Sequence, residues 1–449
     1  MEKEIGAQLV EFAVETKYED IPEETLEFTK CLTLKTVAGM LAGSTKPSAQ
    51  KMAGIIKDKK LPEDCGVIGS DFKTSLWEAA FLNGYFAHAS ELEDDRYVYG
   101  VSWDITVIPL LLPLAEKLGL SGKALLEALV VGLEVHTRTC LFSADHLGLY
   151  NVPGAVGPAI GAAKALGLDV KETAAALGLA MSGVPLSIVN LGTDAHFFES
   201  SLMVLQGMMA AEMAKVGLSG NPDIATYLTN YLGKERVVPE EMVEDFGKRW
   251  VLQEIQIKKY PCCIAMHRQI DLVIELKKEH NLSLEDVEVI EVHSRRKGDA
   301  RCDRPEPKDA NDLQFSFQHT LTAAMLDGDV SLEHFTPEAV VDPRLSEALS
   351  KVEFIPSTSS VGLLGDSMSD EPACVVIKTK DGKTFSRERK YAIGSFQEPL
   401  SLAQFRELYH KFTRGILSEK DISKTAELIL NLERLDNLKE AMDILVLEG

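Results

Sequence analysis

Helical periodicity over the first 260 residues is the feature that most constrains this chain. Apolar residues recur at three- and four-residue spacing in "LEFTKCLTLKTVAGMLAG", "SGKALLEALVVGLEVHTRTC" and "ESSLMVLQGMMAAEMAKVGLSG". That period is typical of α-helices rather than strands. The many small residues in these segments favour helices that pack closely against one another. We therefore expect a large helical domain.

Strand-like segments follow the helical part. "VEVIEVHS" (287–294) alternates apolar and polar residues, and "VVIKTKDGKTFSRERKY" (375–391) contains two strand-like runs around Asp381–Gly382. An Asp-Gly pair between such runs is a strong signal for a two-residue hairpin. The sequence thus predicts a mainly α protein with a smaller α+β domain inserted near its end. The predicted order is an all-helical part (1–264), an α+β domain (265–395) and C-terminal helices that return to the helical domain (396–449).

Length, charge and cysteine pattern exclude several classes of protein. At 449 residues the chain is long enough for two domains. A net charge of −22 argues against nucleic-acid binding, because such binding needs a dense basic face. The longest apolar run, residues 105–115, is too short to span a bilayer. Seven scattered cysteines and a first helix without a basic leader predict reduced thiols in a soluble, cytoplasmic protein.

An acidic segment, "ELEDDRYVYGVSWD" (91–104), lies between two apolar stretches. Burial and like charges both raise carboxyl pKa values, so carboxylates in such a place suit proton transfer. On a helix, Glu91 and Asp95 would share a face and could share one proton. Arg96 could then hold a substrate carboxylate with two hydrogen bonds. The alternative is an acidic helix end that faces water.

A second candidate segment is "IKKYPCCIAMHRQID". Lys258 lies beside its Tyr-Pro turn, where an ammonium group can neutralise a carboxylate that gains enolate character. Lys259 is the alternative by one position. His267 begins the next predicted helix and is either a packing residue or an acid–base group.

Histidines elsewhere in the chain also suit proton transfer. His319 lies in the apolar segment "FSFQHTLTAAML", where it is either a satisfied core residue or an acid–base group. In "GTDAHFFESS", Asp194 and His196 either form an acid–base pair or cap a helix that begins near the following serines. His88 and His136 are predicted to be structural. The sequence contains no H-E-x-x-H and no paired Cys/His spacing, so it predicts no metal site.

The motifs "NGYFAHASELEDD", "IQIKKYPCCIAMHRQID" and "ANDLQFSFQHTLTAAMLDGDV" occur in this order along the chain. They resemble the N-G-x-x-x-H-x-L-D-F-D-D-T, K-x-Y-P-x-C-x-x-x-H and A-x-F-S-x-x-Y-x-x-A-x-x-L-x-D-G segments of the MmgE/PrpD family. That family includes 2-methylcitrate dehydratase, cis-aconitate decarboxylase and iminodisuccinate epimerase. The resemblance implies a helical domain, a smaller α+β lid, an active site in the cleft between them and usually a homodimer. It also implies activities that need no organic cofactor or metal.

The resemblance marks site positions, several of which differ in this chain. A carboxylate is kept at Glu91, and Lys258, Tyr260 and His267 are kept as well. The departures are Asp95 for a threonine, Ser102-Trp103-Asp104 in place of a histidine-containing segment, Asn151 for a second histidine, Asp194 for a lysine and His319 for a tyrosine.

The sequence therefore predicts a cofactor-independent lyase that acts on a small polycarboxylate by α-proton abstraction and β-elimination. A hydro-lyase similar to 2-methylcitrate dehydratase comes first; an isomerase or epimerase, a decarboxylase and a non-catalytic family member are the alternatives. The expected catalytic residues are Glu91, Asp95, Lys258, His319 and His196. The expected substrate-binding residues are Arg96, Ser102, Trp103, Asn151, Asp194, Tyr260 and His267. A homodimer is expected, and no metal, nucleic-acid or membrane partner.

Overall fold

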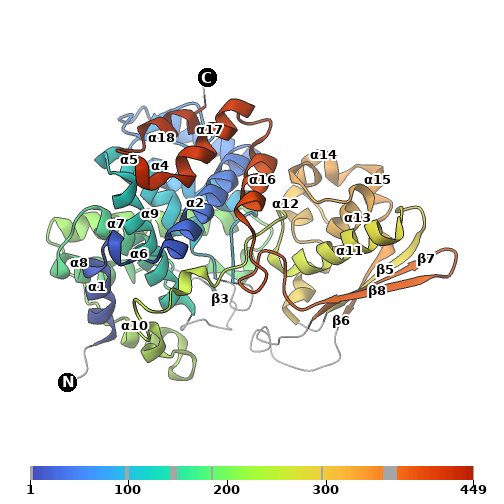
Figure 1. The fold of residues 1–449 in the computed structure, drawn as a ribbon, viewed down its shortest axis with the longest axis horizontal. Helices are drawn as coiled ribbons and strands as arrows, with labels where there is room; N and C mark the ends of the chain where they lie inside the picture. The colour runs from blue at the N-terminus through green and yellow to red at the C-terminus, as the bar shows by residue number, and fades with distance from the viewer. Residues whose placement is uncertain are drawn as a thin grey trace.

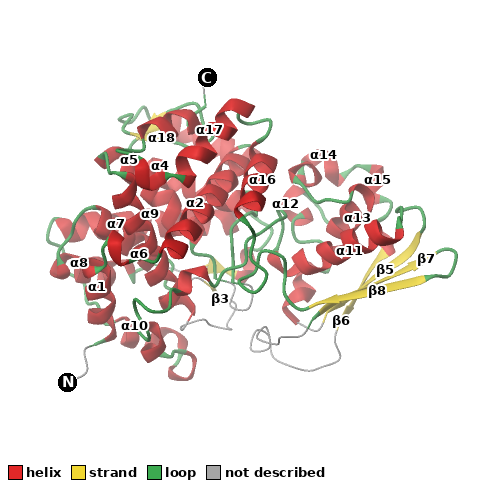
Figure 2. Cartoon of the chain, in the orientation of Figure 1, coloured by secondary structure: helices red, strands yellow, loops and turns green. Residues whose placement is uncertain are grey.

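The computed structural model of the chain describes residues 4–96, 101–141, 149–150, 152–183, 186–294, 297–356 and 372–447. Figure 1 shows a large helical body beside a smaller body that contains a sheet. Figure 2 shows that the long strands lie in the smaller body. The mainly α fold class with a smaller α+β part, predicted from the sequence, is confirmed.

Helices from both ends of the chain form the larger domain. Helix α4 packs against α2, α5 and α9 near its centre, α7 packs against α6 and α9, and α16 returns to pack on α2. In chain order the helices are α1 (Ile5–Glu15), α2 (Glu23–Ser44), α3 (Pro47–Lys57), α4 (Leu76–Ala89), α5 (Asp104–Leu118), α6 (Gly122–Leu141), α7 (Val156–Ala165), α8 (Val170–Ala180), α9 (Asp194–Lys215), α10 (Ile224–Leu232), α16 (Leu402–Thr413), α17 (Glu419–Leu430) and α18 (Lys439–Leu445).

Two short strand pairs interrupt the helices, so the expectation of a wholly helical first part is wrong in this detail. Strand β1 (Cys65–Gly66) pairs with β2 (Lys73–Thr74), and β3 (Leu149–Tyr150) pairs with β4 (Leu186–Ser187). Each strand is two residues long. Such short ladders leave no alternating pattern for the sequence to reveal.

Helices α2 and α4, which position the candidate site, pack with their backbones in contact. Gly43 near the end of α2 makes this possible, because a Cβ atom there would lie 1.8 Å from the carbonyl oxygen of Phe86 in α4. Only glycine allows an approach this close. The end of α4 is thereby held against α2, at the place where the acidic segment begins.

The smaller domain is a four-stranded sheet with helices packed on it. Its strands, in spatial order, are β6 (Val352–Pro356), β5 (Val287–Ser294), β7 (Ala373–Thr379) and β8 (Thr384–Arg389). Strand β5 is parallel to β6 and antiparallel to β7. Strands β7 and β8 form the predicted hairpin around Asp381–Gly382, with Gly382 at a φ of 84°. The strand and hairpin predictions are confirmed.

Helices of the smaller domain complete its core. Helix α11 packs on β7 and β8, and α13 packs on β6. Val375 and Ile377 of β7 are fully buried in one apolar core with Leu272 of α11 and Leu321 of α13. The helices are α11 (His267–His280), α12 (Ala310–Leu313), α13 (Phe317–Asp327), α14 (Pro337–Val340) and α15 (Pro343–Ser346).

The segment that crosses between the domains is paired with the acidic segment. The Asp95 N–H donates to the Gln256 carbonyl oxygen at 3.2 Å, and the Gln256 N–H donates to the Asp95 carbonyl oxygen at 3.0 Å. The Ile257 N–H donates in turn to the carbonyl oxygen of Gly394 at 2.8 Å. Gly394 lies in the segment that leads back to the helical domain. These pairs place Lys258 beside Glu91.

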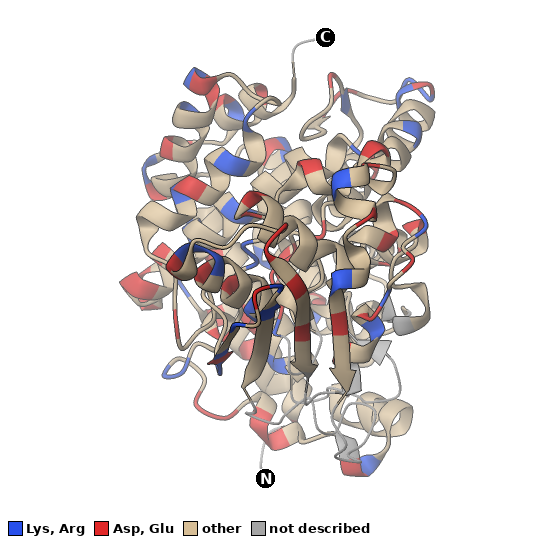
Figure 3. Cartoon of the chain, turned by 90° about the vertical axis from the view of Figure 1, so that its right-hand side faces the viewer, with Lys and Arg blue, Asp and Glu red and all other residues tan. Residues whose placement is uncertain are grey.

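Charged residues of both signs occur on the side of the molecule that carries the sheet (Figure 3). In the view onto the sheet side, Lys and Arg positions are interspersed with Asp and Glu positions (Figure 3). Among the helices that the structure describes, none combines the length and apolar character needed to cross a bilayer.

Replacing Gly43 by alanine tests the close contact of α2 and α4. We expect Gly43→Ala to lower the free energy of unfolding by about 1–3 kcal/mol, because the new methyl group overlaps the Phe86 carbonyl. Gly54→Ala is the matched control: in α3 a Cβ meets nothing within 4 Å, so better helix propensity should raise stability by about 1 kcal/mol. Urea unfolding followed by circular dichroism measures both. A neutral Gly43→Ala would contradict the contact.

Candidate active site

The acidic segment leaves α4 through a tight reversal at Glu91. Helix α4 ends at Ala89, and Glu91 adopts left-handed backbone angles with a φ of 54°. This conformation costs a residue other than glycine about 1–2 kcal/mol. The Glu91 side chain turns inward and is 1% exposed. The segment is therefore not the helix on which Glu91 and Asp95 would share a face, and that expectation is wrong.

Lys258 lies between two buried glutamates. Its Nζ is 3.2 Å from Glu91 Oε2 and 3.3 Å from the Glu91 carbonyl oxygen, and it also contacts Glu93 Oε1. Its backbone N–H donates to Asp94 Oδ1 at 2.7 Å, which fixes the main chain at this point. Lys258, Glu91 and Glu93 are all buried. The ammonium group is therefore held next to the Glu91 carboxyl group.

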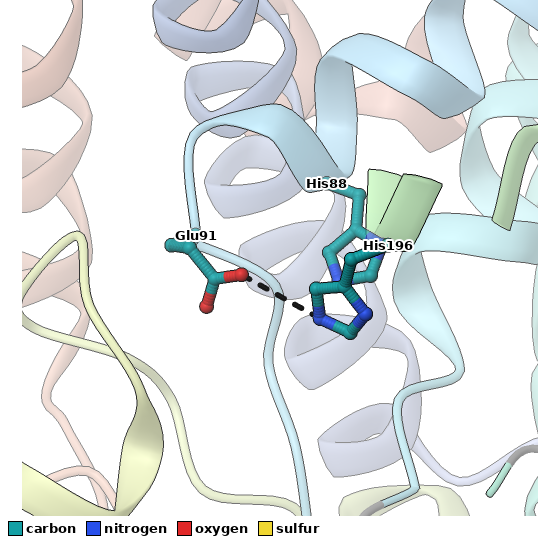
Figure 4. A group of neighbouring side chains, drawn as sticks. All are labelled: His88, Glu91 and His196. Carbon is teal, nitrogen blue, oxygen red and sulfur yellow. Dashed lines mark ion pairs between the residues drawn. The ribbon is translucent and has the colours of Figure 1, made fainter. Parts of the chain in front are cut away.

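Two histidines lie against the other oxygen of the Glu91 carboxyl group (Figure 4). His196 Nε2 is 3.6 Å from Glu91 Oε1. The His88 ring packs on the His196 ring with centroids 4.2 Å apart, and His88 Nδ1 is 3.1 Å from Ser200 Oγ. His88 is in the last turn of α4 and His196 is in the first turn of α9, so two helices in direct contact position the pair.

Burial sets the protonation states of these groups. Burial and the Glu93 charge raise the pKa of Glu91 well above its ordinary value, against the opposing effect of Lys258. Burial lowers the pKa of His196 well below its ordinary value and that of His88 to about 3. Burial also opposes the ammonium form of Lys258, but Glu93 and Glu91 outweigh it and raise its pKa. Burial therefore favours the protonated form of Glu91 and the neutral forms of both imidazoles, whereas the two glutamates favour the charged form of Lys258.

Three further carboxyl groups surround the two glutamates. Asp94 Oδ1 accepts from Lys35 Nζ at 3.2 Å, and Asp104 accepts from the Asp94 N–H at 3.3 Å. Burial raises the pKa of Asp104 well above its ordinary value and that of Asp95 to about 7. Five carboxyl groups therefore lie around two ammonium groups in a region with little access to water. The carboxyl groups outnumber the positive charges, which favours their protonated forms.

His319 is buried in the smaller domain, where its contacts are with other residues of that domain. Its Nε2 is 2.6 Å from the His334 carbonyl oxygen, and its ring packs on Phe335 with centroids 5.7 Å apart. Burial lowers its pKa to about 4. The structure thus brings Glu91, Lys258 and His196 together and gives His319 a hydrogen bond within its own domain.

Lys259, Tyr260 and His267 of the Tyr-Pro segment contact groups other than Glu91. Lys259 Nζ and the Tyr260 hydroxyl both donate to Asp271 Oδ1, at 2.6 and 2.7 Å. His267 Nε2 is 3.2 Å from the Cys262 carbonyl oxygen, and burial, followed by the Lys258 charge, lowers its pKa well below the ordinary value. Of the two adjacent lysines, it is Lys258 that contacts Glu91.

The predicted substrate-binding residues after Asp95 have other partners. Arg96 Nη1 donates to Glu254 Oε2 at 2.5 Å. Trp103 is fully buried, and its Nε1 donates to the Leu252 carbonyl oxygen at 3.2 Å. Ser102 is buried beside it. Asn151 lies outside the described residues.

Asp194 is exposed and is the first residue of α9. The helix therefore begins six residues before Ser200, and the prediction of a helix start near Ser200 is wrong. Asp194 Oδ1 accepts from the Asn311 side chain at 3.2 Å and lies 3.4 Å from the Tyr85 hydroxyl. These contacts place it at the boundary between the domains, rather than in a pair with the buried His196.

A cavity of about 710 Å³ opens at this boundary. Residues within 42–51 and Asp194 line it from the helical domain, and residues within 308–311 and 332–341 line it from the smaller domain. Lys46 is part of its wall and donates to the Gln314 side-chain oxygen at 3.4 Å. The Gln314 side-chain nitrogen donates in turn to the carbonyl oxygen of Ser90, the residue before Glu91, at 3.1 Å. Gln314 therefore links the cavity wall to the start of the acidic segment.

Among the described residues, His88, Glu91 and His196 are the group that offers metal-ligand atoms, all within 4.8 Å of one another. Neutral imidazoles and a carboxylate are a common ligand set for divalent transition metals. The Glu91 carboxyl group, however, already has the Lys258 ammonium at 3.2 Å. A second cation there would meet Coulomb repulsion in a region of low dielectric constant. The arrangement fits proton transfer better than metal binding.

Sequence reasoning missed three residues of this region. His88, predicted to be structural, packs on His196, and Glu93 contacts Lys258. Both lie in or next to the quoted acidic segment, so the three-residue spacing of His88 and Glu91 across the helix end was an available signal. Lys46 offered none, because its surroundings come from parts of the chain far from it in sequence.

Comparisons with known proteins identify the family of the chain. The sequence model of the MmgE/PrpD N-terminal domain matches residues 7–230, and that of the MmgE/PrpD C-terminal domain matches residues 260–434. Together they cover most of the chain. The chain therefore belongs to the MmgE/PrpD family.

Several curated relatives are similar along most of their length. A cis-aconitate decarboxylase-like protein, oryM, of Aspergillus oryzae is 26% identical over 99% of this chain and 98% of its own. The cis-aconitate decarboxylase of Mus musculus is 27% identical over 82% of this chain and 78% of its own. That of Aspergillus terreus is 23% identical over 98% of this chain and 96% of its own.

The raised pKa of Asp95 predicts a pH-dependent stability. Its carboxyl group has a pKa of about 7 in the folded protein, whereas its ordinary value is near 3.8. The folded state therefore holds the proton more tightly, and stability present at low pH is lost as the pH rises through 7. Between pH 5 and pH 8 the free energy of unfolding of the wild type should fall by up to about 3 kcal/mol more than that of Asp95→Asn.

Urea unfolding at the two pH values measures this difference. Asp436→Asn, at an exposed position, is the control and should follow the wild type. If Asp95→Asn loses as much stability as the wild type, the Asp95 carboxyl group does not hold its proton.

Proposed function

We propose that this protein is a lyase that acts on a small polycarboxylate through a carbanion next to a carboxylate, without an organic cofactor or metal. Membership of the MmgE/PrpD family and similarity to cis-aconitate decarboxylases support an enzyme of the lyase type. The observation that carries the proposal is the contact of Glu91 with Lys258 on one side and His196 on the other.

Lys258 is suited to stabilise the carbanion. When a proton leaves the carbon next to a carboxylate, negative charge moves onto the carboxylate oxygens. A fixed ammonium group in a dry site stabilises that charge without reorganising water. Lys258 has its ammonium group fixed by two carboxylates and its main chain fixed by Asp94. It can therefore bind the substrate carboxylate as the charge develops.

Glu91 and His196 supply an acid and a base. Neutral His196 takes the α-proton, and protonated Glu91 donates to the hydroxyl group on the neighbouring carbon. The C–H electrons form the double bond, the C–O bond breaks, and water leaves. The two groups are 3.6 Å apart, so the proton on His196 can return to Glu91 and reset the site. Glu91 is assigned the acid because burial raises its pKa.

Decarboxylation is the second candidate, because the curated relatives bear the name cis-aconitate decarboxylase. Carbon dioxide would leave with the carbanion held by Lys258, and Glu91 would protonate the carbon. This route needs one acid and one cation but no base. Epimerisation would need an acid and a base on opposite faces of one carbon, whereas Glu91 and His196 lie only 3.6 Å apart, so this pair suits the two lyase routes better.

Proton NMR in heavy water tests all these routes at once. Decarboxylation and epimerisation place solvent deuterium on carbon, and elimination does so in its reverse direction, the addition of D2O to the double bond. Purified protein incubated with citrate, 2-methylcitrate, cis-aconitate and malate should therefore label at least one of them. New olefinic signals identify loss of water, and a product shorter by one carbon identifies decarboxylation. A folded protein that labels none of a broad panel of polycarboxylates would contradict the proposal.

Substitutions at Lys258 and Glu91 assign the chemistry. We expect Lys258→Met and Glu91→Gln to slow labelling by about 100-fold or more, because they remove the group that stabilises the charge and the acid. Lys259→Met is the matched control: its ammonium binds Asp271, so labelling should change less than about threefold. Equal losses in Lys258→Met and Lys259→Met would point to a general effect on folding.

Treatment with a chelator separates proton transfer from metal chemistry. Because Lys258 supplies the positive charge next to Glu91, protein dialysed against EDTA should label its substrate at the original rate. Activity that is lost on dialysis and restored by Zn²⁺ would instead make His88, Glu91 and His196 metal ligands.

A further inference from the structure

Lys46 is an ammonium group at the domain boundary that has no carboxylate partner in the part of the chain that the structure describes. It is the N-cap residue of α3, in the short link after α2, and Pro47 follows it. Its Nζ donates to the Gln314 side-chain oxygen and to the Phe335 carbonyl oxygen, both at 3.4 Å. Among the described residues it forms no ion pair within 4.0 Å, so its charge is met by two long, neutral contacts.

Other buried or half-buried lysines have a charged partner or shorter hydrogen bonds. Lys258 and Lys35 contact buried carboxylates. Lys351 has only neutral partners, but it donates to two carbonyl oxygens at 2.9 and 2.6 Å. Buried charges are normally paired or closely hydrogen-bonded, because the desolvation cost is otherwise uncompensated. Lys46 is the exception in this comparison, and the arrangement fits a group that awaits an anion.

The charges that act on Lys46 come from several elements. Burial lowers its pKa to about 8, and Glu91, Asp194 and Asp309 act in the opposite direction. Asp194 and Asp309 are exposed at the cavity, whereas Glu91 belongs to the buried cluster. With a pKa of about 8, Lys46 is mostly charged at neutral pH, and it lines the cavity while it contacts Gln314.

The cavity has the size and lining for a small polar ligand. Its volume of about 710 Å³ falls within the usual 300–1,000 Å³ of ligand pockets. Ser48, Asn311 and Thr336 line it together with Lys46 and can donate hydrogen bonds to a carboxylate. Lys51 and Lys308 are exposed at the same cavity and add positive charge, opposed by four exposed acidic residues. Lys46 is the half-buried cation of this wall.

We propose that Lys46 binds the distal carboxylate of the substrate, so that the site selects acids with at least two carboxylates. This inference rests on the proposed function, because it places the reacting end of the ligand at Glu91 and Lys258 and the other end in the cavity. A charged hydrogen bond would replace the two long neutral ones, which is a favourable exchange. Monocarboxylates would leave Lys46 uncompensated and bind weakly.

Isothermal titration with tricarballylate, a tricarboxylate without a hydroxyl group to eliminate, tests the inference without turnover. We expect the wild type to bind it, Lys46→Met and Lys46→Gln to bind at least 10-fold more weakly, and all three to bind butyrate equally weakly. Lys51→Met is the matched control, because Lys51 lines the same cavity but is exposed; its affinity should stay within threefold. Thermal unfolding of each variant confirms folding.

Two results would overturn the inference. One is an unchanged tricarballylate affinity in the folded Lys46 variants. The other is failure of the wild type to bind tricarballylate at all. Both results are independent of deuterium labelling. If the protein labels a substrate but binds tricarballylate equally well without Lys46, the proposed chemistry stands and only the role of Lys46 is removed. Binding that depends on Lys46, with no labelling of any acid, would keep the carboxylate site and remove the chemistry.

Discussion

The contact of the Lys258 ammonium with Glu91 and Glu93 is the interaction on which the rest of the site depends. All three groups are almost completely withdrawn from water, and moving charges out of water costs more than a simple ion pair returns. Well-packed apolar residues would often serve stability as well or better. The chain nevertheless surrounds this lysine with further carboxyl groups and fixes its backbone through Asp94. An arrangement this costly is characteristic of sites where chemistry, rather than stability, determines the residues.

The contacts around the site fall into two sets that belong to different parts of the fold. Lys258 lies on the crossing segment, which is tied to the acidic segment by the two hydrogen bonds between Asp95 and Gln256. The smaller domain reaches the same place through Gln314, whose side-chain nitrogen donates to the Ser90 and Pro261 carbonyl oxygens at 3.1 and 3.0 Å. The first set joins the reacting groups to one another, whereas the second joins the domains through a neutral amide. Movement of the smaller domain would break the second set and leave the first intact.

Local features of this fold could be predicted from the sequence, and distant contacts could not. The helices and the hairpin at Asp381–Gly382 follow from periodicity and turn chemistry within a few residues. Glu91 and Lys258 were chosen because of a family resemblance, and their contact spans 167 positions in the sequence. The left-handed turn at Glu91 and the packing of His88 on His196 depend on tertiary structure, so the acidic segment was wrongly expected to allow a helix. The hydrogen bond of His319 to the His334 carbonyl oxygen likewise depends on tertiary structure, so neither the local sequence nor the resemblance indicates it.

The excess of carboxyl groups over ammonium groups around Lys258 makes the cluster a store of protons. A polyanion that binds near this cluster adds negative charge to a region where carboxyl groups already outnumber ammonium groups. Binding is then thermodynamically linked to proton uptake, in the same way that folding is linked to it. The affinity for an anionic ligand would fall as the pH rises even where the ligand itself is fully ionised throughout. The pH response of this protein would thus originate in the protein, and the medium would control occupancy of the site partly through protons on carboxyl groups, such as Asp95 and Asp104, that have no role in the proposed reaction.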